Sequence, residues 1–207
     1  MPPDPLVQSP VVLVLASGAG RRFLASGGRE HKLAAPLAGR PLIEHVMEKV
    51  AASGLPSHVV RGIDGGMGAS IAAGVAATQG AAGWLVLPAD LPLILPGSLR
   101  RVAALLDEHA VVVPRRGSAP GHPVGFARQC LAQLLQLRGD AGARSVVERY
   151  RARGAVHDEA LEDDGIVMDI DTVDDLARIE NLIIEARMKM PGMAAMADTA
   201  GDSHGRH

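Results

Sequence analysis

Aromatic residues are scarce in this sequence, since Phe, Trp and Tyr together make up only 2% of its 207 residues. The core must therefore be filled mainly by Ala, Leu, Val and Ile. Proteins that bind single-stranded nucleic acid stack the bases on aromatic side chains. The shortage of such side chains argues against a nucleic acid as the partner.

An excess of positive charge is lacking as well. The chain has 21 Lys and Arg residues against 23 Asp and Glu residues, which gives a formal net charge of −2 at pH 7. Proteins that hold a nucleic-acid backbone present a basic field over a whole surface. We therefore expect any anion to be bound locally, at one site.

Cysteines and long apolar runs are also rare. Cys130 is the only cysteine, so no disulfide can form within the chain, and we expect it to be a small buried residue. The first residues lack the basic start and apolar run of a signal peptide, and no apolar run is long enough to cross a membrane. The histidines form no metal-binding cluster. These absences predict a cytoplasmic protein without a membrane partner.

Strand-like and helix-like segments alternate along most of the chain. Short apolar runs indicate strands, and apolar residues at helical spacing indicate helices between them. The predicted strands cover residues 11–15, 57–61, 84–87 and 110–113, and the predicted helices cover 41–50, 68–79 and 97–108. This order predicts one α/β domain with a mainly parallel sheet, in which ligands bind beyond the carboxyl ends of the strands.

The second half of the chain is predicted less regularly. Its expected elements are a loop over 114–123, an extended segment over 124–126, helices over 128–137 and 141–153, and a strand over 166–171. Thr172 as N-cap with Asp175 in the capping-box position predicts a last, amphipathic helix to about residue 187. We expect residues 1–10 to be an N-terminal extension, 11–187 the domain, and 188–207 a disordered tail.

A glycine-rich loop follows the first predicted strand. The residues Ala16, Ser17, Gly18, Ala19 and Gly20 precede Arg21 and Arg22, and Lys32 comes later. Phe23 stands where a dinucleotide fingerprint needs its third glycine, and the lysine of a Walker A loop is missing. Backbone N–H groups beside three cations suit a triphosphate. The alternative is a flexible loop with solvated arginines.

Carboxylates follow two other predicted strands. Asp90 lies on a turn between Pro88 and Pro92, and such a carboxylate together with phosphate oxygens suits Mg²⁺; the alternative is an aspartate of a surface turn. Asp169 and Asp171 share one face of the predicted strand over 166–171. Two such charges raise each other's pKa unless a cation lies between them. The alternative is that Asp171 only caps the last helix.

The motif LASGAGRRF with Lys32 resembles the LAxGxGxR…K signature of nucleotidyltransferases that have a GT-A-like Rossmann variant. The likeness is closest to the molybdenum cofactor cytidylyltransferase and guanylyltransferase group. It spans about residues 11–187 and includes further motifs in the same order. These are GMGASIAAGV from Gly66, LPADLPLI from Leu87, GHPVGF from Gly121, GDAGAR from Gly139 and DIDTVDDL from Asp169.

The resemblance implies a single three-layer αβα domain that transfers a nucleotidyl group from an NTP to the phosphate of molybdopterin and releases pyrophosphate. It implies catalytic roles for Arg22, Lys32 and Asp90, and Mg²⁺ held by Asp90 and Asp171, with Asp169 in support. The implied substrate-binding residues are Ala16, Ser17, Gly18, Ala19, Gly20, Arg21, Ser70, Pro88 and His122. A recipient molybdoenzyme or its chaperone is the implied partner.

The substrate remains open between related choices. The motifs LASG, GMGAS and GHPVGF resemble the cytidylyl branch and favour CTP. The alternatives are guanylyl transfer from GTP, transfer to another phosphorylated acceptor such as a sugar phosphate, and a non-catalytic escort protein for the cofactor.

Two departures from the family pattern affect the expected site. The loop between Arg22 and Lys32 is lengthened, so either Lys32 closes as a lid or Arg29 shares its role. Between Gly54 and Gly66 there is room for only one short strand, which predicts a smaller sheet at that edge.

Three further residues have two interpretations each. Ser70 either caps a helix or contacts the nucleotide. His122 either contacts the acceptor phosphate or is structural. Arg144 pairs either with the pterin phosphate or with Asp140.

Overall fold

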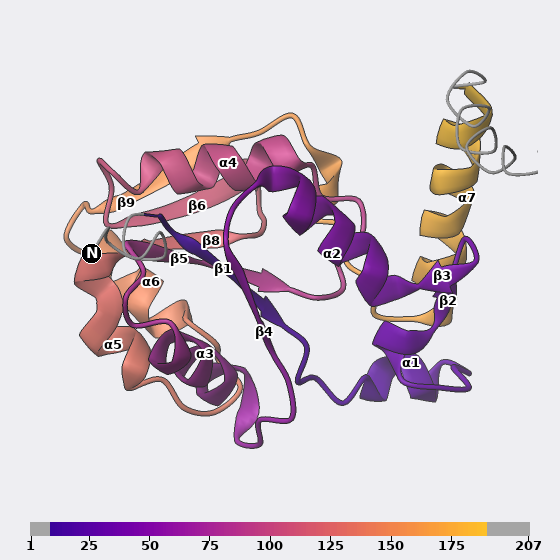
Figure 1. Cartoon of the computed structure of the whole chain (residues 1–207), viewed down its shortest axis with the longest axis horizontal. Helices are drawn as coiled ribbons and strands as arrows, with labels where there is room; N and C mark the ends of the chain where they lie inside the picture. The colour runs from indigo at the N-terminus through magenta and orange to yellow at the C-terminus, as the bar shows by residue number, and fades with distance from the viewer. Residues whose placement is uncertain (1–8, 190–207) are drawn as a thin grey trace, which may run out of the picture.

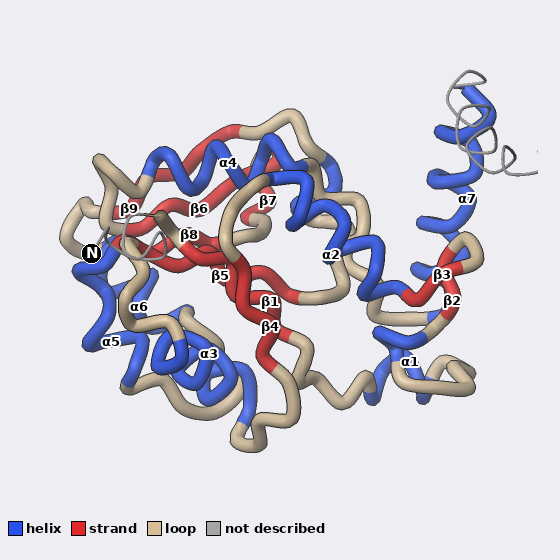
Figure 2. Tube along the Cα trace, viewed as in Figure 1, coloured by secondary structure: helices blue, strands red, loops and turns tan. Residues whose placement is uncertain are grey.

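The computed structural model describes residues 9–189 and shows an α/β fold around one large sheet (Figures 1 and 2). The sheet has seven strands in the order β4-β1-β5-β8-β6-β7, and β9 pairs with β6. The strands are β1 (Val11–Leu15), β4 (Ser57–Val60), β5 (Gly83–Pro88), β6 (Val111–Arg116), β7 (Ala119–Pro120), β8 (Val124–Ala127) and β9 (Val156–Ala160). A separate hairpin joins β2 (Pro36–Leu37) and β3 (Arg40–Pro41).

Helices cover both faces of the sheet, which confirms the predicted three-layer αβα arrangement. On one face α2 lies beside α4, and on the other α3 lies beside α5 (Figure 1). The helices are α1 (Arg21–Ala25), α2 (Leu42–Ser53), α3 (Gly66–Ala77), α4 (Pro96–Leu105), α5 (Leu131–Leu135), α6 (Arg144–Arg151) and α7 (Val173–Lys189), with 3₁₀ turns η2 (Lys32–Ala34), η3 (Arg128–Cys130) and η4 (Asp164–Ile166).

Most strands run in the same direction, as predicted. β1 pairs in parallel with β4 and β5, and β6 pairs in parallel with β9. β8 runs antiparallel between β5 and β6, and the short β7 is antiparallel to β6. The carboxyl ends of β1, β4 and β5 therefore lie at one edge of the sheet, where the loops that follow them meet.

The core consists of aliphatic residues with few rings. Alternate residues of each central strand face opposite layers, so Val12 packs in the cluster with α2 and α4, and Leu13 in the cluster with α3. Trp84 and Phe126 are fully buried in the second cluster. Cys130 is buried beside them, as expected.

The predicted strand over 166–171 is wrong. Ile166 ends the 3₁₀ turn η4, and the residues up to Asp171 form an irregular segment in which Ile166 and Ile170 are buried as single side chains. The last strand is β9, with the polar sequence VHDEA. β9 lies at an edge of the sheet, where it pairs only with β6. Ion pairs such as Arg115 with Asp158 link its exposed side chains to the neighbouring strand.

The predicted loop over 114–123 is also partly wrong, because β6 continues to Arg116 and turns into β7. The helices predicted over 128–137 and 141–153 are shorter, as α5 and α6. β4 is the only strand between Gly54 and Gly66 and lies at the end of the sheet, as the sequence predicts.

The last helix begins as predicted. Thr172 Oγ1 accepts a hydrogen bond from the Asp175 backbone N–H at 3.2 Å, and Asp175 Oδ2 accepts one from the Thr172 N–H at 3.0 Å. α7 extends to Lys189 and leaves the sheet beside the β2-β3 hairpin (Figure 1). The rest of the predicted tail, and residues 1–8 of the predicted extension, lie outside the described residues.

None of the helices within residues 9–189 has the length and apolar character that crossing a membrane requires.

Asp163 joins the segment before α7 to the amino end of α4. Its buried carboxylate accepts hydrogen bonds from Leu95 N at 2.9 Å, Ser98 Oγ at 2.6 Å and Gly165 N at 2.9 Å. These bonds fix where the following residues, up to Asp171, enter the edge of the sheet. Removing the carboxylate leaves three donors without a protein partner.

We therefore predict that Asp163→Ala lowers the free energy of unfolding by about 2–4 kcal/mol, measured by urea denaturation. Asp107→Ala is the matched control, because Asp107 is an exposed aspartate after α4; it should change stability by less than about 0.5 kcal/mol. Equal effects of both substitutions would contradict this role of Asp163.

Candidate active site

The glycine loop leaves the carboxyl end of β1 and turns toward β4. Ala16 N donates to Val60 O at 2.9 Å, and Ser17 Oγ donates to the same oxygen at 3.2 Å. Gly20 then takes a left-handed conformation with φ of 60° and N-caps the short helix α1. A Cβ at Gly20 would lie 3.2 Å from Lys32 Cβ, so the loop packs directly against the base of that lysine.

The lengthened segment from Arg21 to Lys32 is folded. Phe23 is buried, and Gly28 N donates to Phe23 O at 3.1 Å. A Cβ at Gly28 would lie only 2.4 Å from a ring carbon of Phe23, so glycine is needed for this close packing. The segment therefore returns to the glycine loop in a defined way.

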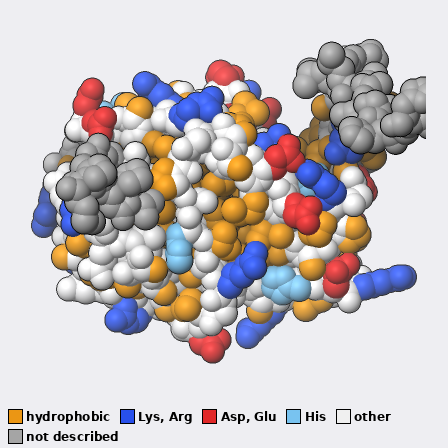
Figure 3. All heavy atoms as spheres, viewed as in Figure 1, with side chains coloured by type: hydrophobic (Ala, Val, Ile, Leu, Met, Phe, Trp, Pro, Cys, Tyr) orange, Lys and Arg blue, Asp and Glu red, His pale blue; other side chains and the backbone are white. Residues whose placement is uncertain are grey.

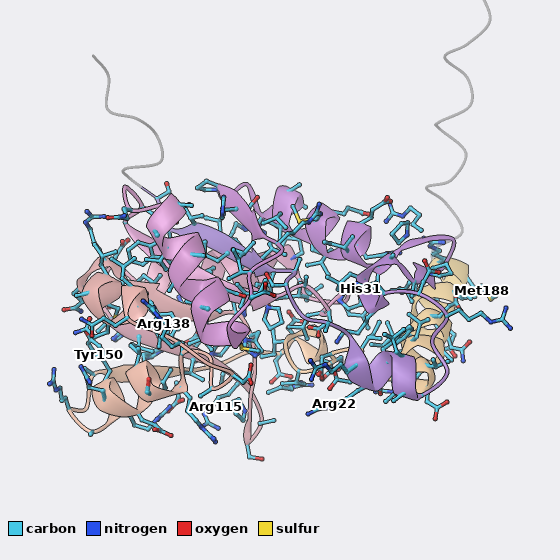
Figure 4. All side chains as sticks on the ribbon, turned by 90° about the horizontal axis from the view of Figure 1, so that it is seen from below. Arg22, His31, Arg115, Arg138, Tyr150 and Met188 are labelled. Carbon is cyan, nitrogen blue, oxygen red and sulfur yellow. The ribbon has the colours of Figure 1, made fainter. Side chains whose placement is uncertain are left out.

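His31 connects the end of this segment to the glycine loop. Its Nδ1 accepts a hydrogen bond from Leu33 N at 3.3 Å. An accepting Nδ1 carries no proton in the neutral ring, so Nε2 is the donor to Gly18 O at 2.8 Å. The sequence pattern does not single out His31, whose only local signal is its position directly before Lys32. Figure 4 shows Arg22 and His31 on the half of the molecule that carries α7, and Arg138 and Tyr150 on the other half.

Lys32 lies between two carboxylates from distant parts of the chain. Its Nζ is 2.7 Å from Asp90 Oδ2 and 3.0 Å from Asp171 Oδ1. The Lys32 side chain is only 12% exposed. Burial acts to lower its pKa, but the two carboxylates outweigh burial and raise the pKa of the ammonium above its ordinary value.

The structure thus places Lys32 within the site, and Arg29 is exposed and forms no ion pair with a described residue. Of the two alternatives for the lengthened loop, it is Lys32 that reaches the carboxylates in this conformation.

Asp90 follows β5 on the predicted turn. Its backbone oxygen accepts from Ile170 N at 3.1 Å, and Ala89 N donates to Leu15 O at 3.1 Å, so the ends of β1 and β5 and the segment before α7 are tied together. Asp90 Oδ1 is buried and has no hydrogen-bond partner among the described residues. A buried carboxylate oxygen without a partner is costly unless a ligand or ion completes it.

Asp171 and Asp169 complete an acidic cluster. Arg22 Nη1 lies 2.6 Å from Asp171 Oδ2. Partial burial acts to raise the pKa of Asp171, but Lys32 and Arg22 lower it below its usual range. For Asp169, removal of solvent by the surrounding protein and then the charges of Asp90 and Asp171 raise the pKa.

His122 lies at the same edge of the sheet, close to Asp90 and Asp169. Burial lowers the pKa of its ring. A hydrogen bond with the Val86 backbone and the charges of the two aspartates act to raise the pKa, but burial outweighs them. Its Nδ1 is buried without a hydrogen-bond partner among the described residues. Pro88, the last residue of β5, pairs with Leu15 beside these groups.

The GMGAS and GDAGAR motifs meet at the amino end of α3. Gly68 N donates to Gly139 O at 2.7 Å, and Gly139 N donates to Gly65 O at 3.0 Å. A Cβ at Gly68 would lie 2.7 Å from the Arg138 backbone, so only glycine allows this approach. The two motifs therefore form one surface.

Two minor interpretations are wrong. Ser70 does not cap α3, because Gly65 is the N-cap and the buried Ser70 hydroxyl donates to Gly66 O at 3.3 Å inside the helix. Arg144 pairs with Glu148 at 3.5 Å instead of with Asp140.

An open groove of about 420 Å³ adjoins the glycine loop (Figure 3). Apolar side chains form most of its walls, and His31, Glu44 and Arg61 add polar groups; the remaining lining residues are Ala16, Leu33, Ala34, Pro41 and Ile43. Arg21 is exposed at the start of α1.

The residues present fit a hard divalent cation. One cation, the Lys32 ammonium, already contacts carboxylates of Asp90 and Asp171, and Asp90 retains one unpartnered oxygen. No group of three or more His, Cys, Asp or Glu with metal-binding geometry occurs in residues 9–189. Mg²⁺ needs no such group, because it binds through one or two carboxylates, waters and substrate phosphates.

Comparisons with known proteins identify the family. The sequence matches the model described as MobA-like NTP transferase domain over residues 12–64 and 58–155. No curated protein is similar enough in sequence to count as a relative.

Solved structures share the fold. A nucleotidyl transferase from Methanothermobacter thermautotroptrophicus has a TM-score of 0.73 at 22% identity, over 86% of this chain and 99% of that chain. Rv0371c from Mycobacterium tuberculosis has a TM-score of 0.68 at 23% identity, over 84% and 98%, and it has also been solved in complex with manganese. Molybdopterin-guanine dinucleotide biosynthesis protein A from Archaeoglobus fulgidus has a TM-score of 0.58 at 21% identity, over 84% and 99%.

Gly18 and Gly20 of the glycine loop differ in whether their positions need a residue without a side chain. Gly20 has a positive φ and contacts Lys32, whereas Gly18 has no atom within 4 Å of an added Cβ and no positive φ. We predict that Gly20→Ala lowers the free energy of unfolding by about 1–2 kcal/mol and that Gly18→Ala changes it by less than about 0.5 kcal/mol. Urea denaturation of both variants tests this difference, and equal destabilisation would refute it.

Proposed function

Because the chain belongs to the family of MobA-like NTP transferase domains, we propose that it transfers CMP from CTP to the phosphate of a molybdopterin-type acceptor and releases pyrophosphate. One observation carries the proposal. Asp90, Asp171 and Lys32 meet beside a glycine loop, and a buried oxygen of Asp90 lacks a partner.

The acceptor phosphate is already ionised, so the reaction requires no general base. Attack of its oxygen on the α-phosphorus places negative charge on the departing pyrophosphate. The protein therefore has to position both phosphates and neutralise this charge. Backbone N–H groups of the glycine loop, Lys32 and Arg22 are the cationic and donor groups at that edge of the sheet.

We assign Asp90 and Asp171 to Mg²⁺, with Asp169 in support. When bound, the ion neutralises phosphate charge and polarises the α-phosphorus. The manganese complex of Rv0371c supports a divalent ion in proteins of this fold. Asp90 and Asp171 would hold it. Burial, and then the charges of Asp90 and Asp171, raise the pKa of the nearby Asp169.

The remaining assignments follow from the same reaction. The loop residues Ala16, Ser17, Gly18, Ala19, Gly20 and Arg21 would face the triphosphate, with Pro88 and His122 toward the acceptor. We propose residues 11–187 as the catalytic domain, a cytoplasmic location, and a molybdoenzyme or its chaperone as recipient of the product. The burial of Ser70 argues for a supporting role in α3.

Asp90 tests the proposed chemistry most directly. We predict that Asp90→Asn lowers the rate of pyrophosphate release from CTP with Mg²⁺ and molybdopterin by about 100-fold or more, because it removes the charge from the proposed metal ligand. Asp107→Asn, at an exposed position after α4, is the matched control and should retain the rate. An Asp90→Asn enzyme with unchanged release would show that Asp90 is not the metal ligand.

The choice of nucleotide rests on the motifs LASG, GMGAS and GHPVGF, which resemble the cytidylyl branch. Guanylyl transfer is the second candidate, supported by the fold shared with the Archaeoglobus protein.

We predict that, with Mg²⁺ and molybdopterin, CTP gives faster pyrophosphate release than GTP. Without acceptor, CTP should raise the melting temperature more than GTP does at equal concentration, because the ligand with higher affinity stabilises the folded state more. A preference for GTP in both measurements would establish the guanylyl alternative. A panel of sugar and isoprenoid phosphates then tests the acceptor.

A further inference from the structure

The Lys32 ammonium contacts both proposed metal ligands, Asp90 and Asp171, at the same time. Its Nζ lies 2.7 Å from Asp90 Oδ2 and 3.0 Å from Asp171 Oδ1. The exposed fraction of these side chains is 12% for Lys32, 18% for Asp90 and 34% for Asp171. The pair of Lys32 with Asp90 is therefore largely shielded from solvent and weakly screened by salt, whereas the pair with Asp171 is more exposed.

A divalent ion and this ammonium cannot share the position. Lys32 Nζ already contacts one oxygen of each carboxylate, and Mg²⁺ binds carboxylate oxygens at about 2.1 Å. An ion held by both Asp90 and Asp171 would therefore come within contact distance of the ammonium. Two cations at contact distance repel each other strongly in a partly buried site. Binding of the ion by both carboxylates therefore requires Lys32 to leave at least one of them.

The Lys32 side chain is anchored at its base and held at its ammonium by the two ion pairs. Gly20 approaches Lys32 Cβ, and His31 fixes the preceding backbone to Gly18. The four-carbon stem beyond Cβ is flexible, and its anchor is the glycine loop itself. A displaced ammonium thus remains next to the backbone N–H groups where phosphates would bind.

Lys32 satisfies only one of the two carboxylate oxygens of Asp90. Its Oδ2 accepts from Lys32, but its Oδ1 is buried without a partner among the described residues. The Asp90 carboxylate can therefore accept a further ligand at Oδ1.

We propose that Lys32 is a resident counter-ion, which neutralises Asp90 and Asp171 in the nucleotide-free protein and moves to the triphosphate when nucleotide and divalent ion bind. Lys32 thereby makes divalent-ion binding weak until the nucleotide offers the ammonium another anionic partner. The first half of this inference depends only on the ion pairs, and the second half rests on the proposed function.

The test measures binding of Mn²⁺ alone, by electron paramagnetic resonance of the free ion, without nucleotide. Lys32→Met keeps most of the side-chain volume and removes the charge, so we expect Mn²⁺ to bind at least about 10-fold more tightly than to the unmodified protein. Adding Asp90→Asn to Lys32→Met should abolish this gain, which assigns the ion to the carboxylate pair. Thermal unfolding of each variant confirms that it is folded.

Arg29→Met is the matched control. It removes one positive charge from the same segment, and Arg29 forms no ion pair with a carboxylate in residues 9–189. It should change Mn²⁺ affinity less than twofold. Unchanged or weaker Mn²⁺ binding by folded Lys32→Met would overturn the proposal. An equal gain with Arg29→Met would also overturn it, since long-range charge would then explain the effect.

The second half is tested with inorganic tripolyphosphate and the unmodified protein. We expect tripolyphosphate to increase Mn²⁺ uptake by the unmodified protein more than by Lys32→Met, after correction for Mn²⁺ bound by free tripolyphosphate. Equal increases would overturn displacement to a triphosphate. If Lys32→Met gains Mn²⁺ affinity but the unmodified protein releases pyrophosphate from neither CTP nor GTP with molybdopterin, the proposed function fails and the counter-ion role stands.

Discussion

The ion pairs of Lys32 with Asp90 and Asp171 are the interaction on which the site depends. They join the segment after β1, the end of β5 and the segment before α7, which are far apart in sequence. Without a cation between them, the two carboxylates would repel each other at a partly buried position. If a divalent ion binds there as proposed, the same charge that stabilises the ligand-free site determines how the ion can enter it.

The fold supplies this meeting point through its mainly parallel sheet. β1 and β5 are neighbours and end at the same edge, so the glycine loop after β1 and Asp90 after β5 start from adjacent strands. The third contribution, Asp171, comes from an irregular segment that Asp163 fixes to α4 and that Ile170 N fixes to Asp90 O. Regular strands thus hold two parts of the site, and buried polar contacts hold the third.

The sequence was sufficient where a local signal decides the structure. The apolar strands β1 and β5, the helix α2 and the Thr172–Asp175 capping box were all predicted. The sequence did not predict β9. Its polar sequence VHDEA forms a strand because it pairs with β6 and makes ion pairs, and no local pattern reveals either. At 166–171 the alternation of apolar and acidic residues imitated a strand, although Ile166 and Ile170 fill the core from irregular backbone.

The position of Lys32 shows most clearly why part of the site was not predictable. Nine residues lie between it and Arg22 in the sequence, yet packing of Phe23 on Gly28 and the bond from His31 to Gly18 O return it to the glycine loop. Three carboxylates, counting Asp169, then face two cations, Lys32 and Arg22, which leaves the cluster with surplus negative charge. The lengthened segment is thus anchored at both ends, and this anchoring places the Lys32 ammonium on the carboxylates and the Lys32 backbone beside the glycine loop.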